Sequence, residues 1–126
     1  MNYCPDCGDR TFLRNVPKDR LPRHVCQGCQ QIHYENPKII VGSLPLLNNS
    51  VLLCKRAINP SIGMWTIPSG FMELGESLED GARREALEEA NLTFEIIKLY
   101  GNYSIPKIGQ VLFVFLVNIL NKDYAP

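Results

Sequence analysis

The sequence predicts an α+β fold with a mixed sheet, preceded by a small cysteine-rich ribbon. Three observations predict this organisation. Two Cys-x-x-Cys pairs lie within the first 29 residues, strand-like apolar segments separated by turns begin at residue 38, and one carboxylate-rich helix interrupts these segments. The change in character places the ribbon at residues 1–36 and the larger domain at residues 37–126.

The larger domain is expected to contain elements in the order β, β, short β, α, β, β. These are strands over 38–44 and 50–56, a short extended segment over 65–68, a helix from Ser77 to about Ala90, and strands near 93–100 and 110–120. A turn at 47–50 joins the first two strands as a hairpin, and residues 59–63 form a loop. Asp80 lies three residues after Ser77, as the partner in a capping box does.

The composition excludes several classes of protein. Thirteen basic residues balance thirteen acidic ones, whereas proteins that coat nucleic acid usually carry a basic excess. The longest apolar run, Val111–Val117, has the length of a strand and not of a membrane span. Met1–Cys4 shows neither the basic nor the apolar region of a signal peptide. We therefore expect a cytoplasmic protein that uses no membrane and whose main partner is a small nucleotide and not a nucleic acid.

Four of the five cysteines form a pattern typical of a structural zinc site. They are arranged as two Cys-x-x-Cys pairs separated by 18 residues: Cys4, Cys7, Cys26 and Cys29. Bound Zn²⁺ would supply the folding energy that so small a core lacks. The alternative is a redox pair, which needs one such motif opening a helix in a βαβ unit. This segment has two pairs and no such unit, so we predict structural zinc.

Other residues near the cysteine pairs have expected roles. Gly8 and Gly28 lie where the turns of a zinc knuckle often need a positive φ or a close backbone approach. His24 and His33 flank the second pair, but because four cysteines complete the metal shell, we expect these histidines at the surface or an interface. Residues 1–38 carry six Lys and Arg against four acidic residues. This small margin favours a structural, domain-docking or dimer-forming ribbon over a nucleic-acid-binding one.

Three carboxylates are expected on one face of the predicted helix. At about 100° per residue, Glu85, Glu88 and Glu89 lie within an arc of roughly 100°, where they repel one another. A hard divalent cation such as Mg²⁺ or Mn²⁺ would offset this repulsion, because such ions prefer oxygen ligands. The alternative for this short pattern alone is a solvated acidic helix face.

The wider pattern around these glutamates favours the metal site. It consists of a glycine, a glutamate six residues on, and an Arg-Glu-aliphatic-x-Glu-Glu run: Gly70, Glu76, Arg84, Glu85, Glu88 and Glu89. Upstream, residues 63–70 contain a Trp-x-x-Pro-x-Gly sequence. Together these segments resemble the Nudix box and its lead-in, and the chain is identified as a member of the Nudix hydrolases. Asn91 replaces the usual glycine after the box, and asparagine also accepts a left-handed helix cap.

The resemblance implies a fold and roles for individual residues. The fold would be the Nudix α/β/α sandwich with a mixed sheet. Ligands of Mg²⁺ or Mn²⁺ would be three glutamates and one main-chain oxygen: Glu85, Glu88, Glu89 and Gly70. Glu88 would also polarise the attacking water, Arg84 would orient a glutamate, and Glu76 would brace the loop before the helix. The expected catalytic group consists of Glu85, Glu88 and Arg84.

The resemblance extends over nearly the whole chain. The ribbon and the segments 34–38, 53–56 and 105–110 resemble zinc-ribbon Nudix hydrolases of the ADP-ribose/FAD pyrophosphatase type. This implies hydrolysis of FAD to FMN and AMP, or of ADP-ribose to AMP and ribose 5-phosphate. The rival NADH pyrophosphatases carry a Ser-Gln-Pro-Trp-Pro-Phe-Pro signature, which residues 102–107 lack. A third alternative is a non-catalytic nucleotide-binding or regulatory Nudix module, which the presence of all three glutamates disfavours.

Several side chains are candidates for substrate contacts. Lys55 and Arg56 would meet phosphate, Glu73 would touch the substrate from the loop of the box, and Tyr103 or Phe71 would stack on a base. The alternative for the charged residues is a solvated surface, and for the two aromatics burial in the core is the favoured role.

The domain is expected to be shortened at its C-terminus. From Lys38 onward 89 residues remain, whereas the resemblance implies a further strand and a C-terminal helix. An unpaired strand edge and an uncovered sheet face would need protection. A homodimer, which the resemblance also implies, would provide it.

Overall fold

The computed structural model describes residues 1–57 and 63–121. The chain forms two compact units, Met1–Asn36 and Pro37–Pro126. The loop expected at 59–63 lies, except for Gly63, outside the described residues. Among the described residues, no helix has the length and apolar character needed to cross a bilayer.

The first unit is a three-stranded antiparallel sheet. Its strands follow the order β1 (Thr11–Arg14), β2 (Arg23–Cys26) and β3 (Ile32–His33). Gly8 has a φ of 85°, as the expected knuckle turn requires. At Gly28, the backbone instead approaches another group closely, because a Cβ there would overlap the Asp9 carboxyl group. Both reasons for a glycine in these turns are therefore found.

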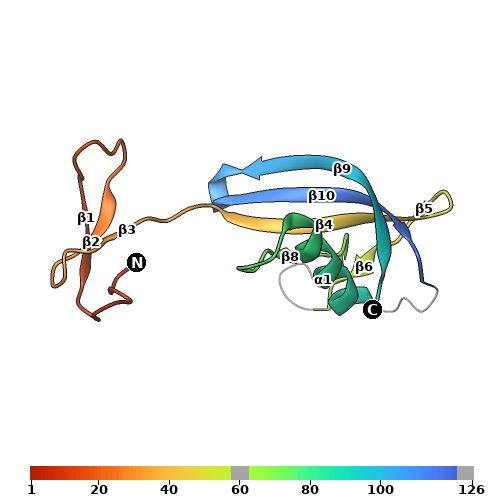
Figure 1. Ribbon diagram of the computed structural model, residues 1–126, viewed down its shortest axis with the longest axis horizontal. Helices are drawn as coiled ribbons and strands as arrows, with labels where there is room; N and C mark the ends of the chain where they lie inside the picture. The colour runs from red at the N-terminus through yellow and green to blue at the C-terminus, as the bar shows by residue number, and fades with distance from the viewer. Residues whose placement is uncertain (58–62, 122–126) are drawn as a thin grey trace. The chain divides into compact units, whose positions relative to one another are not determined.

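The second unit contains a five-stranded mixed sheet, as predicted (Figure 1). Its strands are β4 (Lys38–Leu47), β5 (Ser50–Val51), β8 (Ser69–Phe71), β9 (Phe94–Ile105) and β10 (Gln110–Ile119). The order is β5-β4-β10-β9, and β8 pairs with β4 as well. β4 and β10 are parallel, whereas every other pair is antiparallel. The long strand β4 therefore organises the sheet.

The single strand expected over 50–56 is two short strands in the structure. β5 pairs with the end of β4, whereas β6 (Cys54–Lys55) pairs with β7 (Trp65–Thr66). The reason for the break is Pro45. Leu52 donates its N–H to the Pro45 oxygen at 3.0 Å, but a proline has no N–H with which to return the bond. The pairing of β4 with β5 ends there, and β8 pairs with the same edge of β4 nearer its start, at residues 40–42.

The last two strands are joined more tightly than expected. β9 runs to Ile105, beyond the expected end near Tyr100, and a 3-10 turn (η1, Pro106–Ile108) leads directly into β10. Gly109 ends this turn with a φ of 64°. The sequence marks the turn with Pro106 and Gly109, but the extra strand residues depend on pairing with β10.

The helix α1 (Leu78–Ala90) has the ends that the sequence predicted. The Ser77 hydroxyl accepts a hydrogen bond from the Asp80 N–H at 3.1 Å, which caps the first turn. Asn91 adopts a left-handed conformation with a φ of 49°, and the Leu92 N–H bonds to the Ala86 oxygen at 3.2 Å. This closing pattern replaces the usual glycine without loss of the cap.

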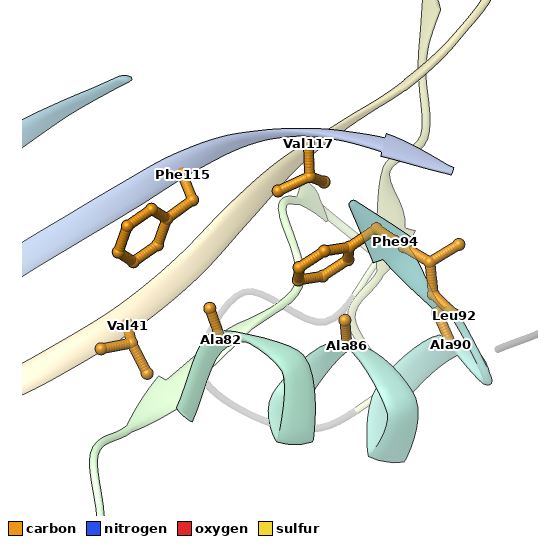
Figure 2. Packing of buried hydrophobic residues seen from close by; sticks show 8 residues of the cluster. All are labelled: Val41, Ala82, Ala86, Ala90, Leu92, Phe94, Phe115 and Val117. Atoms are coloured by element: carbon orange, nitrogen blue, oxygen red, sulfur yellow. The ribbon is translucent and has the colours of Figure 1, made fainter. Parts of the chain in front are cut away.

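The core of the second unit lies between α1 and one face of the sheet (Figure 2). Among the fully buried residues, the helix contributes small side chains, and the sheet and the segment after the helix contribute large ones: Ala82, Ala86 and Ala90 face Val41, Leu92, Phe94, Phe115 and Val117. Small helix residues allow the axis to come close to the sheet. Of the two helical layers of an α/β/α sandwich, the described residues contain the one formed by α1.

Candidate functional site

The close approach of α1 to β8 brings the carboxylates to a strand backbone. Gly81 on the helix lies against β4, because a Cβ there would be 2.8 Å from Cγ2 of Val41. On β8, a Cβ on Gly70 would overlap the carboxyl group of Glu85. The Glu85 side chain, only 13% exposed, therefore lies directly on the Gly70 backbone. Any larger residue at position 70 would displace this carboxylate.

Arg84 connects the loop before α1 with the carboxylates on it. Its Nε and Nη2 donate to the two carboxylate oxygens of Glu76 at 3.0 and 2.8 Å. Its Nη1 donates to Glu85 at 2.8 Å and to Glu88 at 3.3 Å. Nη2 also donates to the main-chain oxygen of Phe71 at 3.0 Å. These five hydrogen bonds equal the five N–H donors of a guanidinium group.

Glu76 is the strongest partner of this arginine. Hydrogen bonds from Arg84 and from the Glu73 backbone N–H, the latter 2.7 Å long, lower the pKa of Glu76 from 4.5 to about 2. The same pairing with Glu76 raises the pKa of Arg84 further above its ordinary value. Glu76 therefore fixes the loop 71–76 to the helix, in the place where the sequence predicted a bracing residue.

Glu88 and Glu89 occupy different environments. Glu89 Oε2 accepts a hydrogen bond from the Ser69 N–H at 3.3 Å. Burial raises the pKa of Glu89, and the negative charges of Glu85 and Glu88 raise it further. The Glu88 side chain is 59% exposed and accepts a hydrogen bond from Arg84. One carboxylate thus faces solvent while the other two lie along β8.

The three glutamates form an open arrangement. In the described part of the chain, groups of three or more potential ligand side chains within 4.8 Å of one another occur in the first unit, and these glutamates do not form one. Arg84 holds two of them, and the Ser69 backbone holds the third. Their donor atoms, all oxygen, fit a hard divalent cation.

Two of the three expected substrate contacts lie near the carboxylates. Arg56 directly follows β6, and its positive charge opposes the rise in the pKa of Glu89. Lys55 stands on β6 with its Nζ 6.0 Å from the centre of the Trp65 ring. Glu73 is largely exposed, with an oxygen 3.8 Å from Arg84 Nε. The structure therefore places Arg56 and Glu73 close to residues of the glutamate group.

The favoured role of the two aromatic residues was burial, and this was wrong. Phe71 and Tyr103 are 51% and 48% exposed. Their strand positions place both on the sheet face opposite to α1, since Phe71 pairs with Ile40 and Tyr103 with Leu112, whereas the helix covers the face of Val41. The Lys38 Nζ lies 5.4 Å from the Phe71 ring.

The four cysteines of the first unit come together as the sequence predicted. Their sulfur atoms all lie within 4.8 Å of one another. The Cys4–Cys29 and Cys7–Cys26 Sγ distances are 3.8 and 3.4 Å. Four sulfurs bound to one zinc ion in a tetrahedron would be separated by about 3.8 Å. The backbone N–H of Cys29 lowers the pKa of Cys26 to about 7, whereas hydrogen bonding with Cys26 raises the pKa of Cys7.

His33 lies beside the cysteine cluster, a contact that the sequence did not indicate. It is half-buried, and its Nε2 lies 3.3 Å from Cys4 Sγ. His24, its neighbour across the β2–β3 pair, is also half-buried. The expectation rested on counting ligands. It did not consider that a side chain outside the shell can hydrogen-bond to a ligand sulfur.

Sequence reasoning also missed two main-chain groups of the site. These are the Ser69 N–H that contacts Glu89 and the Phe71 oxygen that contacts Arg84. Both belong to β8, a strand of three residues that is too short to show a periodic pattern. In the sequence, this strand was indicated only by Pro68 and Gly70, because these residues restrict the backbone conformations that can lie beside β4.

Comparison with known families agrees with this geometry. Residues 36–124 match the NUDIX domain, and residues 2–35 match the family described as Nudix N-terminal. The chain belongs to the Nudix hydrolases. Both matches agree with the predicted Nudix fold and its preceding zinc ribbon.

Individual Nudix relatives resemble the chain to different extents. NAD-capped RNA hydrolase NudC from Vibrio parahaemolyticus is 32% identical over 131 residues, which cover 99% of this chain and 48% of that protein. ADP-ribose pyrophosphatase from Methanocaldococcus jannaschii is 35% identical over 94 residues, which cover 71% of this chain and 56% of that protein. A NUDIX hydrolase from Nitrosomonas europaea, known from a crystal structure, is 52% identical in sequence and superposes with a TM-score of 0.96. The match covers 100% of this chain and 72% of that chain. The chain spans about half the length of the NudC relatives that it matches.

The pairing of Glu76 with Arg84 predicts a pH-dependent contribution to stability. Because the folded pKa of about 2 is below the ordinary value of 4.5, the contribution is complete above pH 4.5 and is lost as pH falls towards 2. We expect Glu76→Gln to lower the melting temperature at neutral pH, and the difference from wild type to shrink between pH 4.5 and 2. Glu79→Gln, an exposed first-turn change, is the control. A difference that stays constant down to pH 2 would contradict the pairing.

Proposed function

We propose that this chain hydrolyses the pyrophosphate bond of an ADP-linked compound in a reaction that needs Mg²⁺ or Mn²⁺. The observation that carries the proposal is the gathering of Glu85, Glu88 and Glu89 beside β8, with Arg84 holding two of them. Several negative charges with few cations among them suit a divalent metal and a phosphate-rich substrate. Membership of a hydrolase family supports catalysis over binding alone.

The residues have distinct proposed roles. Glu85, Glu88 and Glu89, with the main-chain oxygen of Gly70, would hold the metal. Bound there, the cation would neutralise the pyrophosphate and increase the acidity of a bound water. Glu88 is the exposed carboxylate and would accept a proton from the attacking water at its free oxygen. Arg84 keeps Glu85 and Glu88 in place during this transfer.

Groups around the carboxylates would bind the substrate. Arg56 acts on Glu89 through its charge and is suited to a phosphate oxygen, as is the exposed Lys55. On the loop side, a hollow of about 300 Å³ is lined by a mainly apolar set together with the glutamates of the loop: Pro37, Ile39, Met72, Glu73, Leu74, Gly75 and Glu76. It provides room for a substrate group beyond the pyrophosphate, next to Glu73.

ADP-ribose and FAD are the proposed members of this substrate class. The 35% identity to an ADP-ribose pyrophosphatase covers residues of this chain that include most of the second unit. FAD rests on the sequence resemblance alone. NADH is the second candidate, because similarity to NudC proteins extends over 99% of the chain and therefore includes the ribbon. The missing Ser-Gln-Pro-Trp-Pro-Phe-Pro signature places it after ADP-ribose.

A substrate panel tests the activity. We expect Mg²⁺-dependent release of AMP from ADP-ribose and FAD, at a higher kcat/KM than from NADH. The measurement is AMP by chromatography, with and without EDTA. Higher kcat/KM for NADH would reverse the substrate order. Tight binding without turnover of any of the three compounds would establish a non-catalytic module instead.

Substitution of single glutamates tests the assignment of the metal site. Glu88→Gln and Glu89→Gln should each lower kcat at least about 100-fold, because each removes a charged oxygen ligand or proton acceptor. Glu79→Gln lies on the same helix outside the group and is the matched control. Circular dichroism establishes that the variants are folded. Wild-type rates in both Glu88→Gln and Glu89→Gln would refute the site.

The four cysteines are proposed to bind structural zinc. The sulfur geometry supports a closed tetrahedral shell, and Cys4 and Cys26 are almost completely buried. Within residues 1–36 the buried side chains are Cys4, Thr11 and Cys26, so the metal would supply much of the folding free energy of this unit.

Elemental analysis tests this zinc site. We expect about one zinc per chain, and loss of that zinc in Cys26→Ser. Cys54→Ser changes the fifth cysteine, which lies in the second unit, and should keep the metal. Chelation should unfold residues 1–36, which proteolysis of that segment would detect. A metal-free chain whose first unit resists proteolysis would contradict a structural role.

A further inference from the structure

The sheet of the first unit has two chemically different faces. Directly paired residues of an antiparallel sheet share a face, and neighbours along a strand alternate between faces. The pairs Thr11–Cys26 and His24–His33 therefore lie on the face of the metal cysteines. The opposite face carries Phe12, Val25, Ile32, Arg14 and Arg23, and the bridge at the sheet's start adds Tyr3 and Arg10.

Three arginine–aromatic pairs cover this opposite face. Arg10 lies over the Tyr3 ring at 5.7 Å, Arg14 over Phe12 at 5.9 Å, and Arg23 over Tyr34 at 5.0 Å. The last contact also places Tyr34 on this face, where continuation of the β2–β3 register puts it opposite Arg23. We call the six side chains of these pairs the arginine–aromatic face.

The rings of this face are available to a ligand. Tyr3, Phe12 and Tyr34 are 60%, 40% and 56% exposed. A ring with about half of its surface in water contributes little to the core, and three such rings share one face, whereas singly scattered exposed apolar residues are the normal case. The rings therefore require an explanation outside folding.

Positive charge on this face is only partly balanced. Within residues 1–36, all of which the structure describes, Arg10 and Arg14 form no ion pair, and Arg23 pairs with Asp19 at 3.4 Å. Two of the other carboxylates lie elsewhere: Asp9 is against Gly28, and Glu35 is beside the N-terminal amine and His24. Counting the charged residues of the whole ribbon does not reveal this separation of charge, because the count combines this face with the rest of the unit.

We propose that the arginine–aromatic face binds a short single-stranded nucleic acid segment. Unstacked bases stack on exposed aromatic rings, and guanidinium groups contact the phosphates between them. Three rings suit about three bases. A duplex keeps its bases stacked and would meet only the arginines. An acidic peptide would also pair with the arginines but has no use for the planes of the three rings.

Fluorescence anisotropy of the zinc-loaded full chain tests this proposal. The probe is a fluorescein-labelled 12-nucleotide single-stranded RNA, measured across a range of salt concentrations. Binding should weaken as salt rises, because phosphate neutralisation releases counterions. A duplex of the same length should bind more weakly. No measurable binding of the single strand at low salt, or equal binding of the duplex, would overturn the proposal.

Matched variants assign the binding to this face. Arg14→Glu and Phe12→Ala should each weaken RNA binding about tenfold or more, because each removes a phosphate contact or a stacking surface. The controls are Arg20→Glu, an exposed arginine between β1 and β2, and Leu13→Ala, an exposed residue on the opposite face of β1. Both should remain close to wild type.

Two further measurements complete the test. Zinc content shows whether each variant keeps a folded ribbon, so that loss of binding in a zinc-loaded variant reports on the face itself. A labelled poly-glutamate peptide serves as the competing ligand. Equal losses in the controls, or a peptide that binds more tightly than RNA and depends on the same residues, would refute the nucleic-acid assignment. Because AMP release is not measured, the outcome is independent of the proposed hydrolase activity.

Discussion

Arg84 donates hydrogen bonds to two carboxylates of the helix, to the bracing carboxylate of the loop and to the main chain of β8. The arrangement depends on this one side chain. Without it, Glu76, Glu85 and Glu88 would repel one another in a partly buried space. A lysine could not replace it, because an ammonium group has three donors and lacks the planar fork that matches a carboxylate on two sides.

The position of Arg84 depends in turn on small residues. Alanines on the buried side of α1 and Gly81 at its start allow the helix to approach β4 and β8 closely. Gly70 then gives Glu85 room against the strand. The packing of the core and the spacing of the carboxylates therefore depend on each other. Enlarging a buried alanine would move the charged side of the helix as well as the apolar one.

The sequence was most informative where the signal is local. Neighbouring residues were enough to predict the two ends of the helix, at Ser77 and Asn91. They also predicted the cysteine pairs and the spacing of the glutamates. Contacts that need tertiary partners were not predictable. The division of 50–56 depended on which residue of β4 meets Leu52, and that residue is a proline. The exposure of Phe71 and Tyr103 depended on which sheet face the helix covers.

The parallel pairing of β4 with β10 affects the order in which the chain can acquire its structure. Lys38 pairs with Gln110, which is 72 residues further along (110 − 38 = 72). During synthesis, β4 has to wait for this distant partner, and the core around Phe115 and Val117 cannot close earlier. The strand pairs of the first unit are local, so its sheet can form before β10 has been synthesised. The nascent chain would therefore carry a finished ribbon ahead of an unfinished sheet, whose apolar strands are exposed to aggregation during that interval.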